Sequence, residues 1–258
     1  RTPFGTGVRA ISISNIAINQ GYTGQVIDHN DIAVLRLSQG LFGTNAYDLY
    51  DGTSLRGLDF NVAGYGGRST IGGAFGNNAQ TGFLREGDNK FDYRMGDAIF
   101  STIPGNGWQT VFPNNPNIAF SYLSDFDSGF AENDMACRVA RATNLADAAG
   151  SGFCDTGRGA REVGVAGGDS GGPQFVGGRI ASVTSYGLTF GTGFGDCRQG
   201  LNSSCGELNG FVPVYIHRDF IASAMAVPEP ATWAMMILGF GVVGHAGRRA
   251  RAGKVSVA

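Results

Sequence analysis

The chain has 258 residues, enough for one large or two small domains with a hydrophobic core. Glycine contributes 43 of the 258 residues, or about 17%, whereas its usual share is about 7%. Phe and Tyr contribute 18 and 8 residues, so the composition excludes a disordered chain and favours a turn-rich all-β fold. The net charge of −2 divides into +3 for the segment from Val227 onward and −5 for residues 1–226. A mildly acidic body argues against nucleic acid as a partner.

Apolar residues in the first part of the chain follow the two-residue period of strands. Residues 11–14 alternate, and residues 16–18 continue as an apolar run that ends at the turn signal of residues 19–21. Residues 32–37 predict a second strand, and residues 60–66 a third strand with its turn.

The middle of the chain predicts short strands separated by long turns. Residues 67–135 contain Gly-Asn-Gly at 105–107 and Pro-Asn-Asn-Pro at 113–116, both typical of turns. In the body, only residues 138–149 have a composition that favours a helix.

Four cysteines allow three disulfide connectivities, among which sequence alone does not choose. We favour the local pairs Cys137–Cys154 and Cys197–Cys205, because each pair brackets a Gly- and Ser-rich loop. The alternative is a zinc site, but neither a C-x-x-C motif nor His-rich spacing supports it. Disulfides would place the protein in an oxidising compartment.

Two acidic segments, residues 86–89 and 125–127, are candidate calcium ligands. Neither has the spacing of an EF-hand loop, so we expect solvated loop acids there, with no metal and no other cofactor.

The heptapeptide from Gly167 to Pro173, Gly-Gly-Asp-Ser-Gly-Gly-Pro, is the most informative motif. A serine becomes a nucleophile only when a base takes its proton and donors hold the developing oxyanion. Glycines around Ser170 let backbone N–H groups converge on one point. The alternative is a glycine-rich turn with an incidental serine.

This heptapeptide resembles the nucleophile loop of the trypsin and chymotrypsin superfamily of serine proteases. Residues 30–37 look like the aspartate motif of that family, residues 182–187 like its substrate-pairing strand, and residues 210–216 like the strand before its C-terminal helix. The resemblance implies an all-β, chymotrypsin-like double β-barrel. Its first barrel would be incomplete and its second complete, followed by a short helix beginning at His217 and an apolar C-terminal sorting helix. The expected domains are 1–52, 53–226 and 227–258.

The resemblance also implies roles for individual residues. Ser170 would be the nucleophile, the amides of Gly168 and Ser170 would form the oxyanion hole, and Asp31 would orient the base. Asp169 would pair with an amino terminus freed by zymogen cleavage. A polypeptide substrate would contact Gly164, Ser185, Tyr186 and Gly187.

The expected substrate preference follows from the same alignment. The base of the primary pocket lies six residues before the nucleophile in the family, which is Gly164 here, flanked by two valines. Glu162 would supply an acid only if the loop shifted register, and Pro213 would narrow the pocket. We therefore expect small or apolar side chains before the scissile bond.

The chain departs from the family at the catalytic histidine. The family carries a Thr-Ala-Ala-His-Cys-like block several tens of residues before its aspartate, whereas the sole histidine before Asp31 is His29. We expect His29, His217 and His245 to be surface or capping residues. The chain begins at Arg1 without a leader peptide, so truncation is favoured over a histidine-free pseudoenzyme.

Three functions fit the sequence to different degrees. The resemblance favours serine endopeptidase activity through an acyl-enzyme in a longer parent, with the given chain inactive for lack of a base. The alternative from another class is an inactive protease fold that serves as a surface binding module. An esterase would need a G-x-S-x-G elbow between a strand and a helix, and the residues around Ser170 do not offer that context.

The C-terminal tail resembles a PEP-CTERM sorting signal. Val227-Pro228-Glu229-Pro230 is followed by 14 uncharged residues, 231–244, and by basic residues at 248–251. The resemblance implies an exosortase-type transpeptidase of a Gram-negative bacterium that cuts near Pro228, Glu229 and Pro230. Fourteen residues fall short of the about 20 of a membrane span, yet the basic cluster occupies the position of a cytoplasmic stop signal. We expect export to the periplasm, the outer envelope or the extracellular space, with the tail in the membrane before sorting. An ordinary membrane anchor is the alternative.

Overall fold

A computed structural model describes residues 10–41, 46–101, 107–142 and 153–226. The chain divides into two compact units, 1–218 and 219–258. The described residues of the second unit are 219–226. They comprise helix α4 (Arg218–Met225) without its first residue, followed by Ala226. The expected apolar sorting helix lies outside the described residues.

A two-stranded antiparallel sheet occupies the start of the first unit. Strand β1 (Ile13–Ile18) pairs with β2 (Ala33–Leu37), with Ile16 opposite Leu35. Both predicted strands are confirmed to within two residues. Ile16 and Leu35 are each more than half exposed, so this sheet leaves much apolar surface uncovered.

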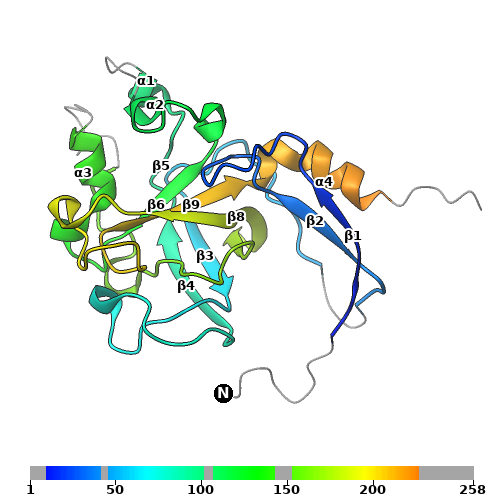
Figure 1. Ribbon diagram of the computed structural model, residues 1–258, viewed down its shortest axis with the longest axis horizontal. Helices are drawn as coiled ribbons and strands as arrows, with labels where there is room; N and C mark the ends of the chain where they lie inside the picture. Colours follow the sequence, from blue (N-terminus) through cyan, green and yellow to red (C-terminus); the bar gives the residue numbers. More distant parts are fainter. Residues whose placement is uncertain (1–9, 42–45, 102–106, 143–152, 227–258) are drawn as a thin grey trace, which may run out of the picture. The chain divides into compact units, whose positions relative to one another are not determined.

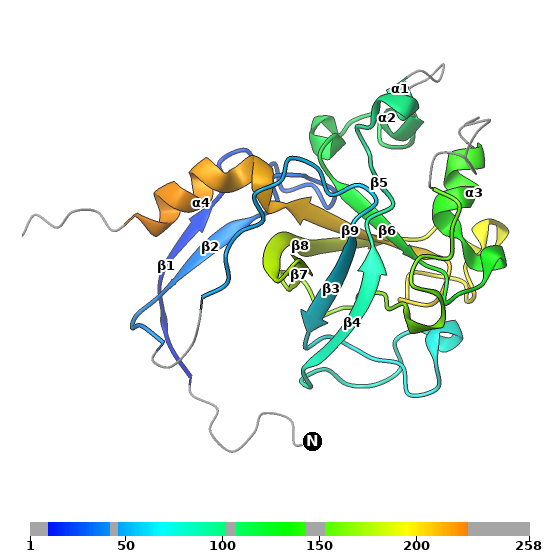
Figure 2. The same ribbon diagram turned by 180° about the vertical axis from the view of Figure 1, so that it is seen from behind.

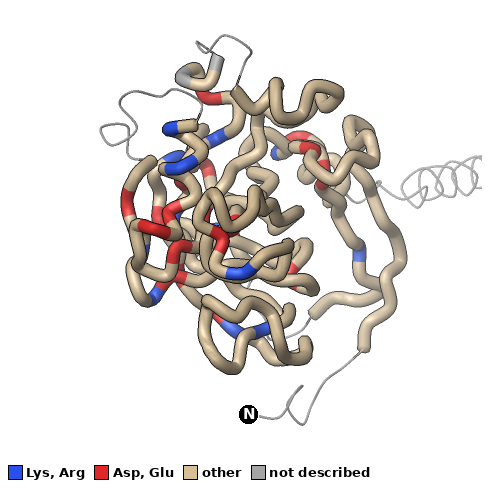
Figure 3. Tube along the Cα trace, turned by 60° about the vertical axis from the view of Figure 1, so that its left-hand side comes forward, with Lys and Arg blue, Asp and Glu red and all other residues tan. Residues whose placement is uncertain are grey.

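A seven-stranded antiparallel sheet forms the body of the first unit (Figure 1). Strands β8, β9 and β6 run across the view and β3 and β4 run down it, so the sheet curls around its core (Figure 2). Acidic and basic residues are interspersed along this sheet and its loops (Figure 3). Its strands, in sheet order, are β4 (Arg85–Lys90), β3 (Asp59–Gly64), β7 (Pro173–Val176), β8 (Arg179–Leu188), β9 (Glu207–Pro213), β6 (Tyr122–Phe126) and β5 (Tyr93–Arg94).

Two glycines form the hairpin turn between β7 and β8. Val176 on β7 pairs with Arg179 on β8, so only Gly177 and Gly178 connect the two strands. Their φ angles are +58° and +77°, which a two-residue turn matching the twist of a hairpin requires.

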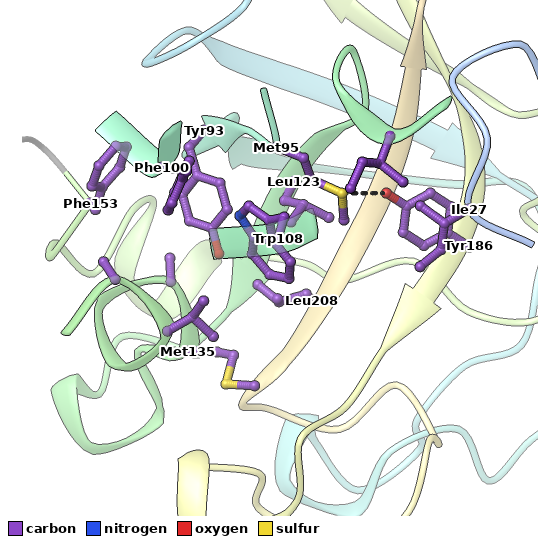
Figure 4. Packing of buried hydrophobic residues seen from close by; sticks show 14 residues of the cluster. Ile27, Tyr93, Met95, Phe100, Trp108, Leu123, Met135, Phe153, Tyr186 and Leu208 are labelled. Atoms are coloured by element: carbon purple, nitrogen blue, oxygen red, sulfur yellow. Dashed lines mark hydrogen bonds between the residues drawn. The ribbon is translucent and has the colours of Figure 1, made fainter. Parts of the chain in front are cut away.

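Two aromatic-rich clusters fill the core. The larger one gathers Tyr93, Phe100, Trp108 and Phe153, and Ile27 joins it from the loop between β1 and β2 (Figure 4). The smaller one packs Phe60, Phe91 and Phe211 around Leu55, with ring centroids 4.3–5.6 Å apart. These clusters explain how a glycine-rich chain buries enough apolar surface to fold.

The helices differ in part from the sequence expectation. Helix α3 (Met135–Ala142) begins three residues before the expected stretch, because Asp134 accepts the Cys137 N–H at 2.7 Å and caps its first turn. Helices α1 (Ala98–Ser101) and α2 (Gly107–Val111) lie where only strands and turns were expected. Four- and five-residue helices are too short to produce a 3.6-residue period. No helix among the described residues is long and apolar enough to cross a membrane.

Both disulfides have the predicted local connectivity. Cys137 pairs with Cys154 and Cys197 with Cys205, with Cα–Cα separations of 4.4 and 5.3 Å. The bridges use all four sulfurs, so the zinc-site alternative is wrong.

The stretch before the expected domain boundary at residue 52 is attached to the larger sheet. Leu49 forms a β-bridge with Ile180, and the Arg218 guanidinium donates hydrogen bonds to the carbonyls of Tyr50 and Gly52. The boundary between 52 and 53 stays a prediction.

Candidate active site

The glycine-rich loop before β7 has the backbone that the heptapeptide predicted. Gly168 and Gly171 have φ angles of +99° and +76°, a region that only glycine enters without cost. A Cβ on Gly168 would also lie 3.1 Å from the Gly66 Cα. The Gly171 N–H donates to the Thr184 carbonyl at 2.8 Å, which ties the loop to β8. Ser170 itself is exposed.

Asp169 anchors this loop from within. Its Oδ1 accepts the Gly66 N–H at 2.7 Å, and its Oδ2 accepts the Ala166 N–H at 2.9 Å. A Cβ on Gly64 or Gly66 would collide with the carboxylate, so glycines at the end of β3 make room for it. Both oxygens therefore have backbone partners, and pairing of Asp169 with an amino terminus stays a prediction.

Asp31 reaches β8 across 154 residues of sequence. Its Oδ2 accepts a hydrogen bond from the Ser185 hydroxyl at 2.6 Å. The pairing of β8 with β9 shifts register between Thr184 and Tyr186, so Ser185 lies at an irregularity of the strand. Such irregularities re-aim a side chain that would otherwise follow the alternation of the strand.

A cavity of 450 Å³ brings Ser170 together with the three residues of β8 that were expected to contact substrate. Ser170 lines it from the glycine-rich loop, and β8 contributes Ser185, Tyr186 and Gly187. Asp31 therefore binds, through Ser185, to the wall of the cavity that Ser170 also lines. A second cavity, of 900 Å³, is lined by Gly168, Asp169, Ser170 and Gly171 together with residues of β3, β4 and β7.

Three residues proposed for the substrate pocket lie elsewhere. Gly164 and Glu162 line a third cavity, of 330 Å³. Val165, which follows Gly164 in the sequence, lines both this cavity and the 450 Å³ cavity. Pro213 does not line the 450 Å³ cavity, because it pairs with Ser182 at the far end of β9. Narrowing by Pro213 of a pocket based on Gly164, and the role of Gly164 itself, stay predictions.

Two polar residues of this cavity escaped the sequence reasoning. Glu207 is 3% exposed, and its carboxylate accepts the backbone N–H groups of Asn202, Ser203 and Ser204. Burial raises the pKa of Glu207, while these three N–H bonds lower it. Asn209 Oδ1 accepts the Val165 N–H at 3.0 Å and so fixes one cavity wall. The S-x-x-E spacing of Ser204 and Glu207, typical of a capping turn, is the only local signal for this arrangement.

The two histidines of the described residues line neither of the cavities that Ser170 lines. His217 ends a 3₁₀ turn (Val214–His217), and α4 begins at the next residue. It is 5% exposed, its Nε2–H donates to the His29 carbonyl at 2.7 Å, and its Nδ1 accepts from Asn19 at 3.0 Å. The predicted C-terminal helix is confirmed to within one residue. The expectation that His217 is a surface or capping residue is wrong, because its ring is buried and bonds to His29 and Asn19.

His29 is half-buried against the edge of Phe120, with ring centroids 5.4 Å apart. Burial lowers the pKa values of both His29 and His217. Within the described residues, neither ring forms a hydrogen bond with Asp31 or Ser170. His245 lies outside the described residues.

Comparison with known proteins supports two of the resemblances. Neuropsin, a serine protease expressed in the limbic system of mouse brain, has a similar solved structure with a TM-score of 0.50. The match covers 84% of this chain and 72% of neuropsin at 14% sequence identity. The chain has a chymotrypsin-like fold. No curated protein matches it in sequence.

Residues 226–252 match the PEP-CTERM protein-sorting motif. This motif indicates export and sorting to the envelope, and it implies an exosortase-type processing partner. The protein is thus an exported protein with a protease-like fold.

Proposed function

We propose that this chain belongs to a serine endopeptidase that cleaves peptide bonds through an acyl-enzyme. The observation that carries the proposal is the Asp31–Ser185 hydrogen bond at the wall of the cavity lined by Ser170. A carboxylate and an exposed serine beside one cavity are two members of a serine triad. The missing member is an imidazole that takes the Ser170 proton and is oriented by Asp31.

The backbone around Ser170 supports a role in binding the oxyanion. Within the described residues, the N–H groups of Gly168 and Ser170 donate no hydrogen bond, whereas those of Asp169, Gly171 and Gly172 all bond within the fold. Two free donors beside a nucleophile are what a tetrahedral intermediate requires.

The free edge of β8 supports the binding of an extended peptide. Strand β7 pairs with β8 only as far as Val183, so Ser185, Tyr186 and Gly187 have β9 on one side and no strand on the other within the described residues. An extended polypeptide adds to such an edge through main-chain hydrogen bonds. Asp169 would hold the loop at this edge.

We propose that the substrate side chain enters the 450 Å³ cavity. Val165, Tyr186 and Leu208 give it apolar walls. The Glu207 carboxylate is already bonded to three backbone N–H groups and the Ser204 hydroxyl, which leaves little of its charge for a substrate cation. Small or apolar residues before the scissile bond follow from this lining.

Turnover of a peptide ester by three proteins tests the proposal. The given chain should be nearly inactive, the chain extended by its natural upstream residues active, and the extended Ser170→Ala variant about 10³-fold or more slower. Ser38→Ala in the extended protein is the matched control, because Ser38 is an exposed serine directly after β2 of the two-stranded sheet. Full activity of the given chain would contradict the assignment, since it would require another base.

The binding-module alternative has one observation in its favour: neither described histidine ring forms a hydrogen bond with Asp31 or Ser170. An extended protein that has no histidine block upstream and no turnover would support this alternative.

We further propose that the exosortase-type partner cuts near Pro228, Glu229 and Pro230. The prolines would keep this site extended, while the tail holds it at the membrane.

A further inference from the structure

Five carboxyl groups are buried together at one end of the seven-stranded sheet. None of the five residues is more than 5% exposed, and they are Asp92, Asp125, Asp127, Asp134 and Glu162. Burial of this many carboxylates is costly unless each is neutralised by a proton, a basic side chain or a metal ion. The sequence expectation of solvated loop acids at Asp125 and Asp127 is therefore wrong.

Three of these residues converge from separate segments. Asp125 lies on β6, Asp127 lies in the turn that follows, and Glu162 forms a bridge with Asp88 of β4. One carboxylate oxygen from each of Asp125, Asp127 and Glu162 lies within 4.8 Å of those of the other two.

Backbone donors satisfy only part of this cluster. Glu162 Oε2 accepts the N–H of Asp127 at 2.8 Å, Asp125 Oδ2 accepts that of Ala136 at 3.0 Å, and Asp127 Oδ1 accepts that of Gly129 at 2.6 Å. Asp127 Oδ2 has no hydrogen-bond partner, although Asp127 is 0% exposed. Within the described residues, no Lys or Arg forms an ion pair with any of the three carboxylates.

The spacing and chemistry of these oxygens match a hard divalent cation. Calcium binds oxygen at about 2.3–2.6 Å, so two ligand oxygens on opposite sides of the ion lie about 5 Å apart. The 4.8 Å limit of this cluster fits around one such ion. Carboxylates without a cysteine or histidine favour calcium over zinc. The exported setting agrees, because extracellular calcium sites operate at about 10⁻⁴–10⁻³ M calcium.

We propose that Asp125, Asp127 and Glu162 bind a calcium ion, with the unpartnered Oδ2 of Asp127 as one ligand. Glu162 lines the 330 Å³ cavity, which gives the ion a route from solvent. The ion ties the end of β6 to the segment that leads from Glu162 through Val165 to Ser170. This inference does not depend on catalysis.

Calcium titration of the given chain tests the proposal. After treatment with a chelator and dialysis, isothermal titration with CaCl₂ should show one site. At about 10 mM CaCl₂, some 10–100 times the expected Kd, the Tm should rise by about 3–10 °C. Asp127→Asn should abolish both signals, because it replaces the unpartnered oxygen while an amide oxygen can still accept the Gly129 N–H.

Glu86→Gln is the matched control and should keep both signals, because Glu86 is an exposed acid on β4. If Asp127→Asn fails to fold, Glu162→Gln takes its place. The absence of heat and of a Tm shift in the unmodified chain would overturn the proposal and indicate a proton shared within the cluster. An undiminished shift in the variant, or an equal shift with MgCl₂, would overturn it as well.

Discussion

The Asp31–Ser185 hydrogen bond connects the two-stranded sheet region to β8, and its energy can be isolated by a double-mutant cycle. The cycle combines Asp31→Ala, Ser185→Ala and the double variant. Each single change removes the bond together with other contacts of its own side chain, and the cycle cancels those contacts.

The expected coupling follows from the geometry. The 2.6 Å distance between the Ser185 Oγ and the Asp31 Oδ2 is that of a charge-assisted bond. Hydrogen bonds to charged groups contribute about 1.5–3 kcal/mol, and solvent weakens a partly buried one. We therefore expect a coupling free energy of about 1–2 kcal/mol, which corresponds to roughly a tenfold change in the ratio of folded to unfolded chain.

Urea unfolding of the four proteins measures this coupling. As a control, Asp31→Ala combined with Ser182→Ala should be additive, because Ser182 lies three residues away along β8 and bonds Gln174 instead. A coupling below about 0.5 kcal/mol, the scatter of independent pairs, would refute the assignment of Asp31 to this site.

Two further predictions concern the buried His217 and the glycine-rich loop around Ser170. Burial lowers the pKa of His217, so the unfolded chain binds a proton at a pH where the folded chain does not. The stability that His217 contributes is therefore lost as the pH falls below about 6.5, the ordinary histidine value. Thermal unfolding at pH 8 and pH 5 should show the advantage of the unmodified chain over His217→Gln shrinking, and a constant difference would contradict this. Gly168→Ala forces a side chain into a φ of +99° and against Gly66, so urea unfolding should show a loss of about 1–3 kcal/mol, and a neutral result would contradict the loop geometry.

Several features were predictable from the sequence because their causes act over a few residues. The alternation of residues 11–14 and the short apolar runs of residues 16–18 and 32–37 predicted β1 and β2, since such patterns reflect the strand backbone itself. The glycines around Ser170 predicted a tight loop, since only glycine adopts the φ angles of Gly168 and Gly171. The disulfides also followed, because each pair closes a short loop.

Burial and long-range contact were decided by the tertiary structure alone. Asp125 and Asp127 look like ordinary loop acids in sequence, and they are buried because Glu162 and α3 pack over the end of β6. Glu207 reaches the cavity of Ser170 because β9 pairs with β8 in a register set by contacts far away in the chain. A residue's own neighbours in sequence determine its backbone conformation, whereas its solvation and charge environment depend on segments that only folding brings to it.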